Sequence, residues 1–356
     1  MQKMMNGLRN EDCMKLLESS IYKCDLEKAI KYIELDLLED KTIFITGGLG
    51  LICSAIVDLL LCYGKTGNIY IGARDEKQFK TRFGEMEKAV YIKYNALEDE
   101  ELNINPDYII CGAGLASPEL YTMKPVETIL SNFQGVQSLL KFSKQKKVQR
   151  LLYISSSEVY GEKNTEASFE EDMYGKIDID NIRYSYAIAK KASEMLCKAY
   201  YSEYNVNTII VRPGHIYGPS AKETDRRISS DFAFKAAKGE KLVMKSSGLQ
   251  KRSYCYSLDC AVQILNVLLK GESGKSYNVG HDEITTIKKM SEILAKAGNV
   301  ELSIAKPSEN EKNSFNPMNN SCLDNNRVKK LGYRDIFTVE EGLTHTVEIL
   351  QEIRKA

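Results

Sequence analysis

The stretch that most constrains the fold is the segment 41–64, which reads KTIFITGGLGLICSAIVDLLLCYG. It predicts a short β-branched strand from Thr42 to Thr46, a glycine turn, and an amphipathic helix that ends near Gly64. In this setting a glycine-rich loop is typical of dinucleotide binding, because Gly47 permits a tight turn and Gly50 lets a pyrophosphate approach the backbone. The start of the helix then offers N–H groups and a positive dipole end to the phosphates. A turn that binds nothing is the alternative.

The third glycine of the usual pattern, three residues after Gly50, is replaced by Cys53. We interpret Cys53 as a buried, inert thiol rather than a redox-sensitive one. The nine cysteines form no CxxC pair and no Cys/His cluster, which favours a reducing compartment over a disulfide framework. The three histidines lack metal-ligand spacing, so no metal site is expected.

The second predicted strand, NIYIGARD, bears on the choice of cofactor. An acidic residue at its tip, about 20 residues past the glycines, would bind the ribose hydroxyls of NAD. Gly72 stands there instead, and Arg74 follows closely, which favours the 2′-phosphate of NADP. In the rival interpretation, Asp75 reaches the ribose of NAD and Arg74 points to solvent.

Strands and helices alternate along the chain. Further strands are predicted at Ala89–Tyr94, Tyr108–Gly112 and Arg150–Ser155, with a helix at Val126–Ser143 between the last two. This order predicts an α/β fold with a Rossmann-like, doubly wound parallel sheet, whose ligands lie beyond the carboxyl ends of the strands. Three parts follow from it: a helical extension (1–40), a dinucleotide-binding domain (41–212), and a smaller mixed α/β substrate-binding region (213–356) interleaved with it.

Tyr186 and Lys190, in RYSYAIAKKASE, are spaced to share one face of a helix. A lysine ammonium one turn away would favour the phenolate, because an opposite charge stabilises the ionised form. Tyr186 is therefore a candidate general acid/base for a hydroxyl or carbonyl group. An ordinary solvated helix also carries such pairs, so the interpretation depends on the rest of the chain.

The charge balance narrows the classes of partner. Lys plus Arg and Asp plus Glu both number 49, which speaks against a nucleic-acid or acidic-membrane surface. No signal-peptide core and no run long enough to span a membrane is present in the sequence. We therefore expect a cytoplasmic protein that binds neither nucleic acid nor membrane.

Four motifs in order, TGGLGLIC, YISSSEVYG, RYSYAIAKK and RPGHIYGP, resemble the extended short-chain dehydrogenase/reductase family of nucleotide-sugar epimerases, dehydratases, decarboxylases and reductases. The resemblance covers about residues 41–350. Within the family the chain is most similar to the UDP-glucuronate decarboxylase branch, through LASPELYTMKPVETI, SSSEVYG, RISSDFAFKAAKGEKLVM and QKRSYCYSLD.

The resemblance assigns roles by position. Ser156 matches the catalytic hydroxyl that bonds the reacting oxygen, Tyr186 the base, and Lys190 the lysine that lowers the pKa of the base and holds the nicotinamide ribose. Glu158 and Arg252 match the pair that decarboxylases place by the substrate carboxylate, although an arginine at the latter position more widely binds the diphosphate. Ser157 stands where dehydratases carry an aspartic acid, which counts against dehydration.

The full set of candidate site residues joins those indicated by the glycine loop, the second strand and the strand ends to those implied by the resemblance. The candidate cofactor-binding residues are Gly47, Gly50, Leu51, Ile52, Arg74, Asn95, Ala113 and Lys190. The candidate substrate-binding residues are Ser117, Arg183, His215 and Arg252, with His215 standing where an asparagine commonly meets the substrate. The expected partners are a nucleotide-sugar substrate and a second copy of the chain in a homodimer.

The reaction expected begins with oxidation of the sugar at C4 to a transient ketone. Decarboxylation of UDP-glucuronate is the preferred outcome. Epimerisation at C4 and NADPH-dependent reduction of a keto sugar are the alternatives. A nucleotide-binding regulator without turnover is disfavoured by the presence of Ser156, Tyr186 and Lys190 together.

Overall fold

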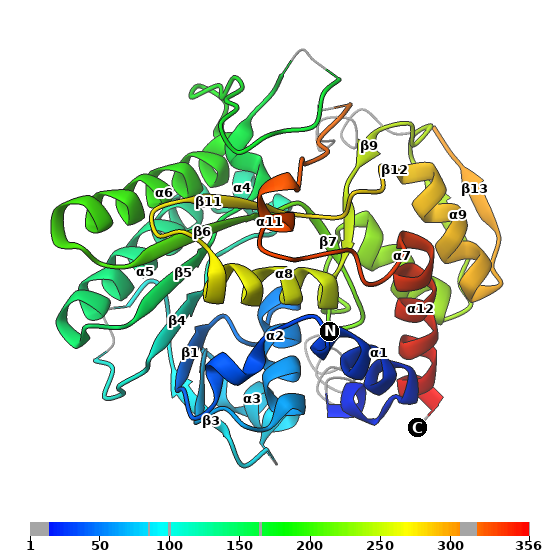
Figure 1. Cartoon of the computed structure of the whole chain (residues 1–356). Helices are drawn as coiled ribbons and strands as arrows, with labels where there is room; N and C mark the ends of the chain where they lie inside the picture. Colours follow the sequence, from blue (N-terminus) through cyan, green and yellow to red (C-terminus); the bar gives the residue numbers. More distant parts are fainter. Residues whose placement is uncertain (1–13, 85, 99–100, 164–165, 307–318, 356) are drawn as a thin grey trace, which may run out of the picture.

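The computed structural model describes residues 14–84, 86–98, 101–163, 166–306 and 319–355. Within this part of the chain, the largest sheet has seven parallel strands in the order β11-β6-β5-β4-β1-β2-β3. The strands are β1 (Ile43–Thr46), β2 (Ile69–Ala73), β3 (Ala89–Lys93), β4 (Tyr108–Cys111), β5 (Arg150–Ile154), β6 (Thr208–Pro213) and β11 (Ser276–Val279). Strands are added outward on both sides of β1 (Figure 1), so the doubly wound Rossmann-like fold is confirmed.

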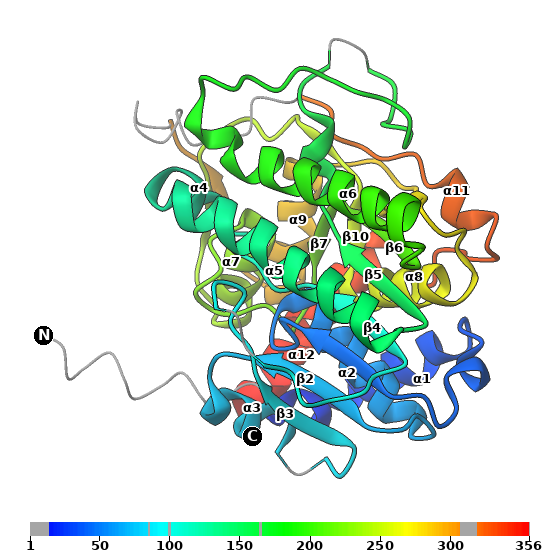
Figure 2. The same ribbon diagram turned by 90° about the vertical axis from the view of Figure 1, so that its left-hand side faces the viewer.

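Both faces of the sheet are buried, which explains the continuous apolar runs in its strands. Ile43, Ile45 and Ile110 pack on one face with α2 (Leu51–Tyr63) and α8 (Ser257–Lys270). Phe44 and Ile109, which alternate with them, pack on the other. This second face is covered by α5 (Pro125–Lys146) and α6 (Ser185–Tyr204), which lie side by side in Figure 2.

The substrate-binding region predicted at 213–356 combines helices with small sheets. Its two-stranded pairs are β10 with β7, β12 with β9, and β13 with β8. The bounds are β7 (His215–Tyr217), β8 (Leu242–Met244), β9 (Lys251–Arg252), β10 (Tyr254–Tyr256), β12 (Thr285–Thr286), β13 (Leu302–Ile304), α7 (Ile228–Ala237), α9 (Ile287–Gly298), α11 (Asn326–Lys329) and α12 (Val339–Lys355). The chain returns to the large sheet through β11, as Figure 1 shows.

Shorter helices complete the described part of the chain: α3 (Glu76–Phe83), α4 (Pro118–Met123), η3 (Ser157–Tyr160) and η4 (Ile182–Tyr184). Two of these, η3 and α4, follow the carboxyl ends of β5 and β4 in the sequence. None of the helices in the described ranges is both long and apolar enough to cross a membrane.

The helical extension predicted at 1–40 packs onto the body of the protein; its first 13 residues lie outside the described ranges. Its elements are η1 (Met14–Glu18), α1 (Ser20–Ile30) and η2 (Leu35–Leu38). Tyr22 on α1 is fully buried and donates a hydrogen bond to Asp58 of α2 at 2.7 Å. Asp58 also forms a buried ion pair with Arg82. The extension is therefore part of the core rather than an appendage.

The extension also contacts the C-terminal helix α12 through α1, which lies beside α12 in Figure 1. Asp25 on α1 is buried and accepts a hydrogen bond from the hydroxyl of Tyr256 at 3.0 Å. His345 on α12 places Nδ1 3.0 Å from the same carboxylate. The hydrogen bond to Asp25 raises the pKa of His345 above its ordinary value.

This pair makes stability depend on pH. Because the folded state raises the pKa of His345, the stabilisation is fully present below the unfolded pKa of about 6.5 and is lost as pH rises through the folded value. A partly exposed ion pair contributes up to about 1 kcal/mol. We expect His345→Gln to lower the urea midpoint at acidic pH and to match the wild type at alkaline pH. A difference that is the same at every pH would contradict this linkage.

Candidate active site

The glycine loop forms a cradle between β1 and α2. Gly47 has a φ of +70°, and an added Cβ would lie 2.9 Å from the backbone of Gly112. Gly50 is the N-cap of α2, and no side chain caps the helix there. The N–H groups of Leu51 and Ile52 therefore remain at the helix start for an anionic ligand. These residues fit the pyrophosphate of a dinucleotide.

In the usual pattern the third glycine of the loop permits close packing of the helix on the sheet. Here a glycine that follows a strand, Gly112, permits it instead. Cys53 lies on α2 with its thiol against Gly112, which follows β4, and an added Cβ on Gly112 would collide with the sulfur. The missing glycine of the helix is thus offset by a glycine opposite it. Burial raises the pKa of Cys53 to about 12, in agreement with its interpretation as an inert thiol.

The tip of β2 gives different roles to Asp75 and Arg74, the two candidates for recognition of the cofactor ribose. Gly72 packs under Phe44, whose ring would lie 3.1 Å from an added Cβ. Asp75 caps α3, because its two oxygens accept hydrogen bonds from the backbone and side-chain amides of Gln78 at 3.1 and 3.0 Å. Arg74 is exposed, and the described ranges show no hydrogen bond or ion pair for it. The carboxylate is therefore committed to the helix, and the guanidinium is available.

Asn95 and Ala113 follow the ends of β3 and β4. The amide of Asn95 is used locally: it accepts from the N–H of Leu97 at 3.2 Å and donates to Glu98 at 2.6 Å. The N–H of Ala113 donates to the hydroxyl of Thr46, the last residue of β1, at 3.2 Å. The structure thus brings Ala113 beside the glycine loop, while Asn95 shapes its own turn.

Tyr186 and Lys190 lie on α6, both buried. Lys190 Nζ donates to the carbonyl of Ile154, the last residue of β5, at 2.8 Å and lies 5.7 Å from the centre of the Tyr186 ring. Burial, followed by the charge of Glu158, raises the pKa of Tyr186 above its ordinary value. Burial also lowers the pKa of Lys190 to about 8. The expectation of a depressed phenol pKa is wrong here, because burial disfavours the charged forms of both groups.

Three other groups favour the phenolate of Tyr186. Hydrogen bonds from the side chains of Ser156 and Tyr121, together with the charge of Arg227, lower its pKa against the effect of burial. The Tyr121 ring stacks on the Tyr186 ring, with 4.4 Å between their centres and an angle of 4° between their planes. Tyr121 is presented by α4, whose N-cap is the candidate substrate residue Ser117.

Glu158 forms an ion pair with Arg183, whose Nη1 lies 3.0 Å from Oε2. The two side chains are 21% and 19% exposed, and they connect η3 to η4 close to the stacked tyrosines. The family resemblance places Arg252 together with Glu158 beside the substrate carboxylate. Arg183 is the partner in the structure, so the charge of Glu158 is balanced before any substrate binds.

His215 and Arg252 lie in the part of the chain, 213–356, that the sequence predicts to bind the substrate. His215 on β7 contacts the Tyr254 ring edge-on at 5.8 Å. Arg252 is buried and donates from Nη1 to the carbonyl of Lys251 at 2.8 Å. Burial, followed by the charges of Arg252 and Arg227, lowers the pKa of His215 to about 3, so its imidazole is neutral at neutral pH.

Two residues near Tyr186 were not found from the sequence. Tyr121 and Arg227 lie in LASPELYTMKPVETI and RISSDFAFKAAKGEKLVM, two stretches that carry the family resemblance, but neither has spacing that indicates chemistry. Arg227 precedes α7 and is paired with Asp225. Within the described ranges, no group of three or more His, Cys, Asp or Glu side chains is placed to hold a metal ion.

A doubly wound sheet, a glycine cradle and a buried tyrosine–lysine pair with a serine beside it define an extended short-chain dehydrogenase/reductase. The chain belongs to the NAD dependent epimerase/dehydratase family, whose model matches residues 43–280.

Curated relatives agree with this membership. UDP-glucuronic acid decarboxylase 1 of Danio rerio is 26% identical over 350 residues, which cover 96% of this chain and 80% of the relative. UDP-glucuronic acid decarboxylase 6 of Arabidopsis thaliana is 30% identical over 257 residues, 71% of this chain and 73% of the relative. The crystal structure of UDP-glucose 4-epimerase from Thermotoga maritima matches this chain with a TM-score of 0.74 at 21% identity. The match covers 87% of this chain and 99% of the epimerase chain.

Proposed function

We propose that this protein is an NAD(P)-dependent nucleotide-sugar-modifying enzyme that oxidises its substrate at C4, and that its reaction is decarboxylation of UDP-glucuronate. The observation that carries the proposal is the placement of the Glu158–Arg183 ion pair beside Ser156, Tyr186 and Lys190. The names of the curated relatives from D. rerio and A. thaliana support the same reaction.

Backbone and side chains on the sheet edge would hold the cofactor. The pyrophosphate would lie on the N–H groups of Leu51 and Ile52. Lys190 would hold the nicotinamide ribose, and Ala113 would line the cofactor beside the glycine loop. When bound, the nicotinamide supplies a hydride acceptor that later returns the hydride.

Tyr186 exchanges the proton of the sugar 4-hydroxyl. Burial keeps its phenol protonated in the free enzyme, so removal of the 4-hydroxyl proton depends on Ser156, Tyr121 and Arg227, which favour the phenolate. Oxidation at C4 makes a C5 carboxylate part of a β-keto acid. The C5–carboxyl bond then breaks, its electrons enter the enolate, carbon dioxide leaves, and C5 takes up a proton.

The ion pair suits a substrate that carries a carboxylate. Arg183 would offer a guanidinium to the substrate carboxylate, and Glu158, which is paired with it, would handle the proton at C5. Arg252, His215 and Ser117 would bind the rest of the nucleotide sugar. We also propose a homodimer, supported by exposed apolar side chains on α5 and α6: Val126, Ile129, Leu130 and Met195.

The experiment that tests the proposal is incubation of the purified protein with a panel of nucleotide sugars. Carbon dioxide release, product mass and nicotinamide absorbance are followed together. The proposal predicts that UDP-glucuronate is converted to a product lighter by carbon dioxide, without net change of the cofactor. Conversion of neutral sugars alone would instead indicate an epimerase or a reductase.

A reductase of nucleotide-linked keto sugars is the second candidate, because of the tip of β2. The capping role of Asp75 leaves Arg74 available for a 2′-phosphate, and we propose NADP(H) as the preferred cofactor. Arg74→Ala should then weaken NADP binding by about 1.5–3 kcal/mol and leave NAD binding unchanged. Calorimetric titration of both cofactors checks this, with Lys77→Ala on the exposed side of α3 as control. Equal affinity of the unmutated protein for NAD and NADP would contradict the preference.

A further inference from the structure

The face of α6 that carries Tyr186 and Lys190 continues to Glu194. Steps of four residues place the three side chains along one side of the helix. Glu194 is buried, at 4% exposure, and lies one turn beyond Lys190. A buried carboxylate needs a partner, because an unpaired charge in the interior is costly.

Arg212 on β6 is that partner. Its Nε and Nη2 donate to the two oxygens of Glu194 at 2.9 and 2.7 Å, and its side chain is also buried. A bidentate ion pair of this kind fixes the angle as well as the distance between two groups. The pair therefore fixes to β6 the face of α6 that carries Tyr186 and Lys190.

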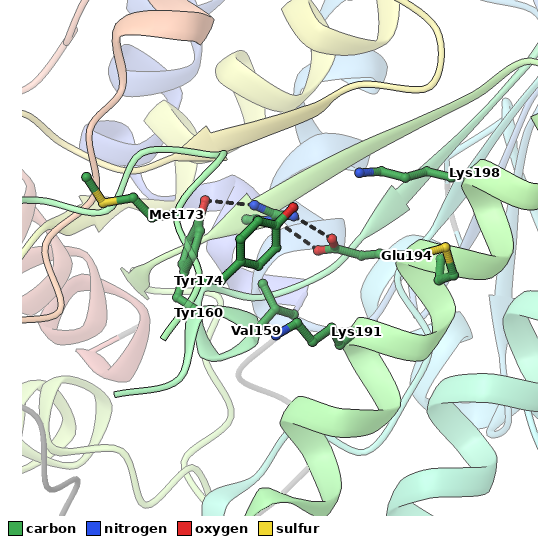
Figure 3. A pocket seen from close by; sticks show the side chains of 9 residues that line it. Val159, Tyr160, Met173, Tyr174, Lys191, Glu194 and Lys198 are labelled. Carbon is green, nitrogen blue, oxygen red and sulfur yellow. Dashed lines mark hydrogen bonds and ion pairs between the residues drawn. The ribbon is translucent and has the colours of Figure 1, made fainter. Parts of the chain in front are cut away.

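The third nitrogen of Arg212 reaches the element that carries Ser156. Nη1 donates to the hydroxyl of Tyr160 at 3.0 Å and to the carbonyl of Glu171 at 2.8 Å. The hydroxyl of Tyr160 in turn donates to Oδ1 of Asn278 on β11 at 2.5 Å. In Figure 3, Tyr160 and Glu194 are labelled on either side of the dashed lines that mark their hydrogen bonds with Arg212. Tyr160 ends η3, whose N-cap is Ser156.

These contacts close a ring through the proposed site. Lys190 donates to the carbonyl of Ile154 at the end of β5, and the chain then runs through Ser156 to Tyr160. From there Arg212 leads back through Glu194 to α6. Tyr186 lies one turn before Lys190 on α6, where its hydroxyl is hydrogen-bonded to Ser156 and its ring centre lies 5.7 Å from Lys190 Nζ.

We propose that Tyr160, Arg212 and Glu194 form a positioning clamp that holds Ser156 and Lys190 in register with Tyr186 and supports the charged form of Lys190. The clamp rests on the proposed function, in which Tyr186 exchanges the proton of the substrate. Its members are positioning residues, because they act through Ser156 and Lys190 rather than on the substrate.

The surroundings of Lys190 explain the electrostatic part of the clamp. The groups that face it are Cys53 of α2, Cys111 of β4, Tyr153 of β5, and Tyr186, Glu194 and Cys197 of α6. Burial raises the pKa values of the thiols and phenols in this set, so they are neutral at neutral pH. The carboxylate of Glu194 raises the pKa of Lys190 against the effect of burial.

The first test is Tyr160→Phe, which removes one hydroxyl and keeps the ring. Tyr174→Phe is the matched control, because Tyr174 lines the same surface pocket (Figure 3) and is 71% exposed. Misplaced catalytic groups cost up to about 10²-fold in rate. We expect Tyr160→Phe to lower kcat by about ten- to a hundredfold with KM nearly unchanged, and Tyr174→Phe to behave as the wild type.

The second test is the pH profile of Glu194→Gln. Loss of the carboxylate should lower the pKa of Lys190 further, so the alkaline limb of kcat/KM should move to lower pH. A merely structural role would lower the rate without moving the profile. If this variant does not fold, the comparison of Tyr160→Phe with Tyr174→Phe decides whether the clamp positions the site: equal kcat values for the two variants would contradict it.

The two proposals fail differently. An active, Tyr186-dependent wild type combined with an unchanged Tyr160→Phe variant would overturn the clamp alone. A wild type that converts no nucleotide sugar, although it binds NAD or NADP, would overturn the proposed function and the clamp that rests on it.

Discussion

Tyr186→Phe is expected to lower turnover by about 10²–10⁴-fold and to leave cofactor affinity nearly unchanged. The range is the usual cost of losing a general acid/base. The phenylalanine keeps the stack on Tyr121 and removes the hydroxyl that bonds Ser156. Steady-state rates and calorimetric titration of the cofactor measure the two parts of the prediction.

Tyr204→Phe is a suitable control for that experiment. Tyr204 ends the same helix, is 42% exposed, and lies more than four turns from Tyr186. Its variant should retain wild-type kinetics. A Tyr186→Phe variant with the wild-type rate would assign the acid/base role to another group.

Glu158→Gln is the second large effect expected, and it separates the possible reactions. The glutamine keeps the shape but cannot carry a proton or balance Arg183. Release of carbon dioxide from UDP-glucuronate should slow by about 10²-fold or more. The initial reduction of the cofactor should persist, because the charge of Glu158 raises the pKa of Tyr186 and its loss eases formation of the phenolate.

Rapid-mixing absorbance and carbon dioxide release separate these two steps, with the exposed Glu170→Gln as control. An unmutated enzyme that ignores UDP-glucuronate and converts neutral sugars would end the decarboxylase proposal. The role of Tyr186 would survive that result, because epimerisation and reduction need the same proton exchange.

Local patterns allowed much of the sheet and its helices to be predicted. The expected strand at Tyr108–Gly112 is β4, Tyr108–Cys111, and the expected helix at Val126–Ser143 is α5, Pro125–Lys146. In these segments the apolar period, the glycine turns and the tertiary packing all favour the same structure.

Contacts between segments far apart in the sequence could not be predicted from local patterns. The partner of Glu158 is 25 residues away, and nothing in the spacing distinguishes Arg183 from Arg252 as its cation. Tyr121 meets Tyr186 only because α4 and α6 pack together. The raised pKa of Tyr186 depends on its burial, which the helical spacing of Tyr186 and Lys190 does not show.

The most direct test of the central claim follows the hydrogen on C4. The purified enzyme is mixed with UDP-glucuronate that carries deuterium at C4, and the bound cofactor is examined by mass spectrometry during turnover. Oxidation at C4 predicts deuterium on the reduced nicotinamide in the wild type, and almost none in Tyr186→Phe over the same time. Turnover of the labelled substrate without any transfer of deuterium to the cofactor would contradict the proposed reaction.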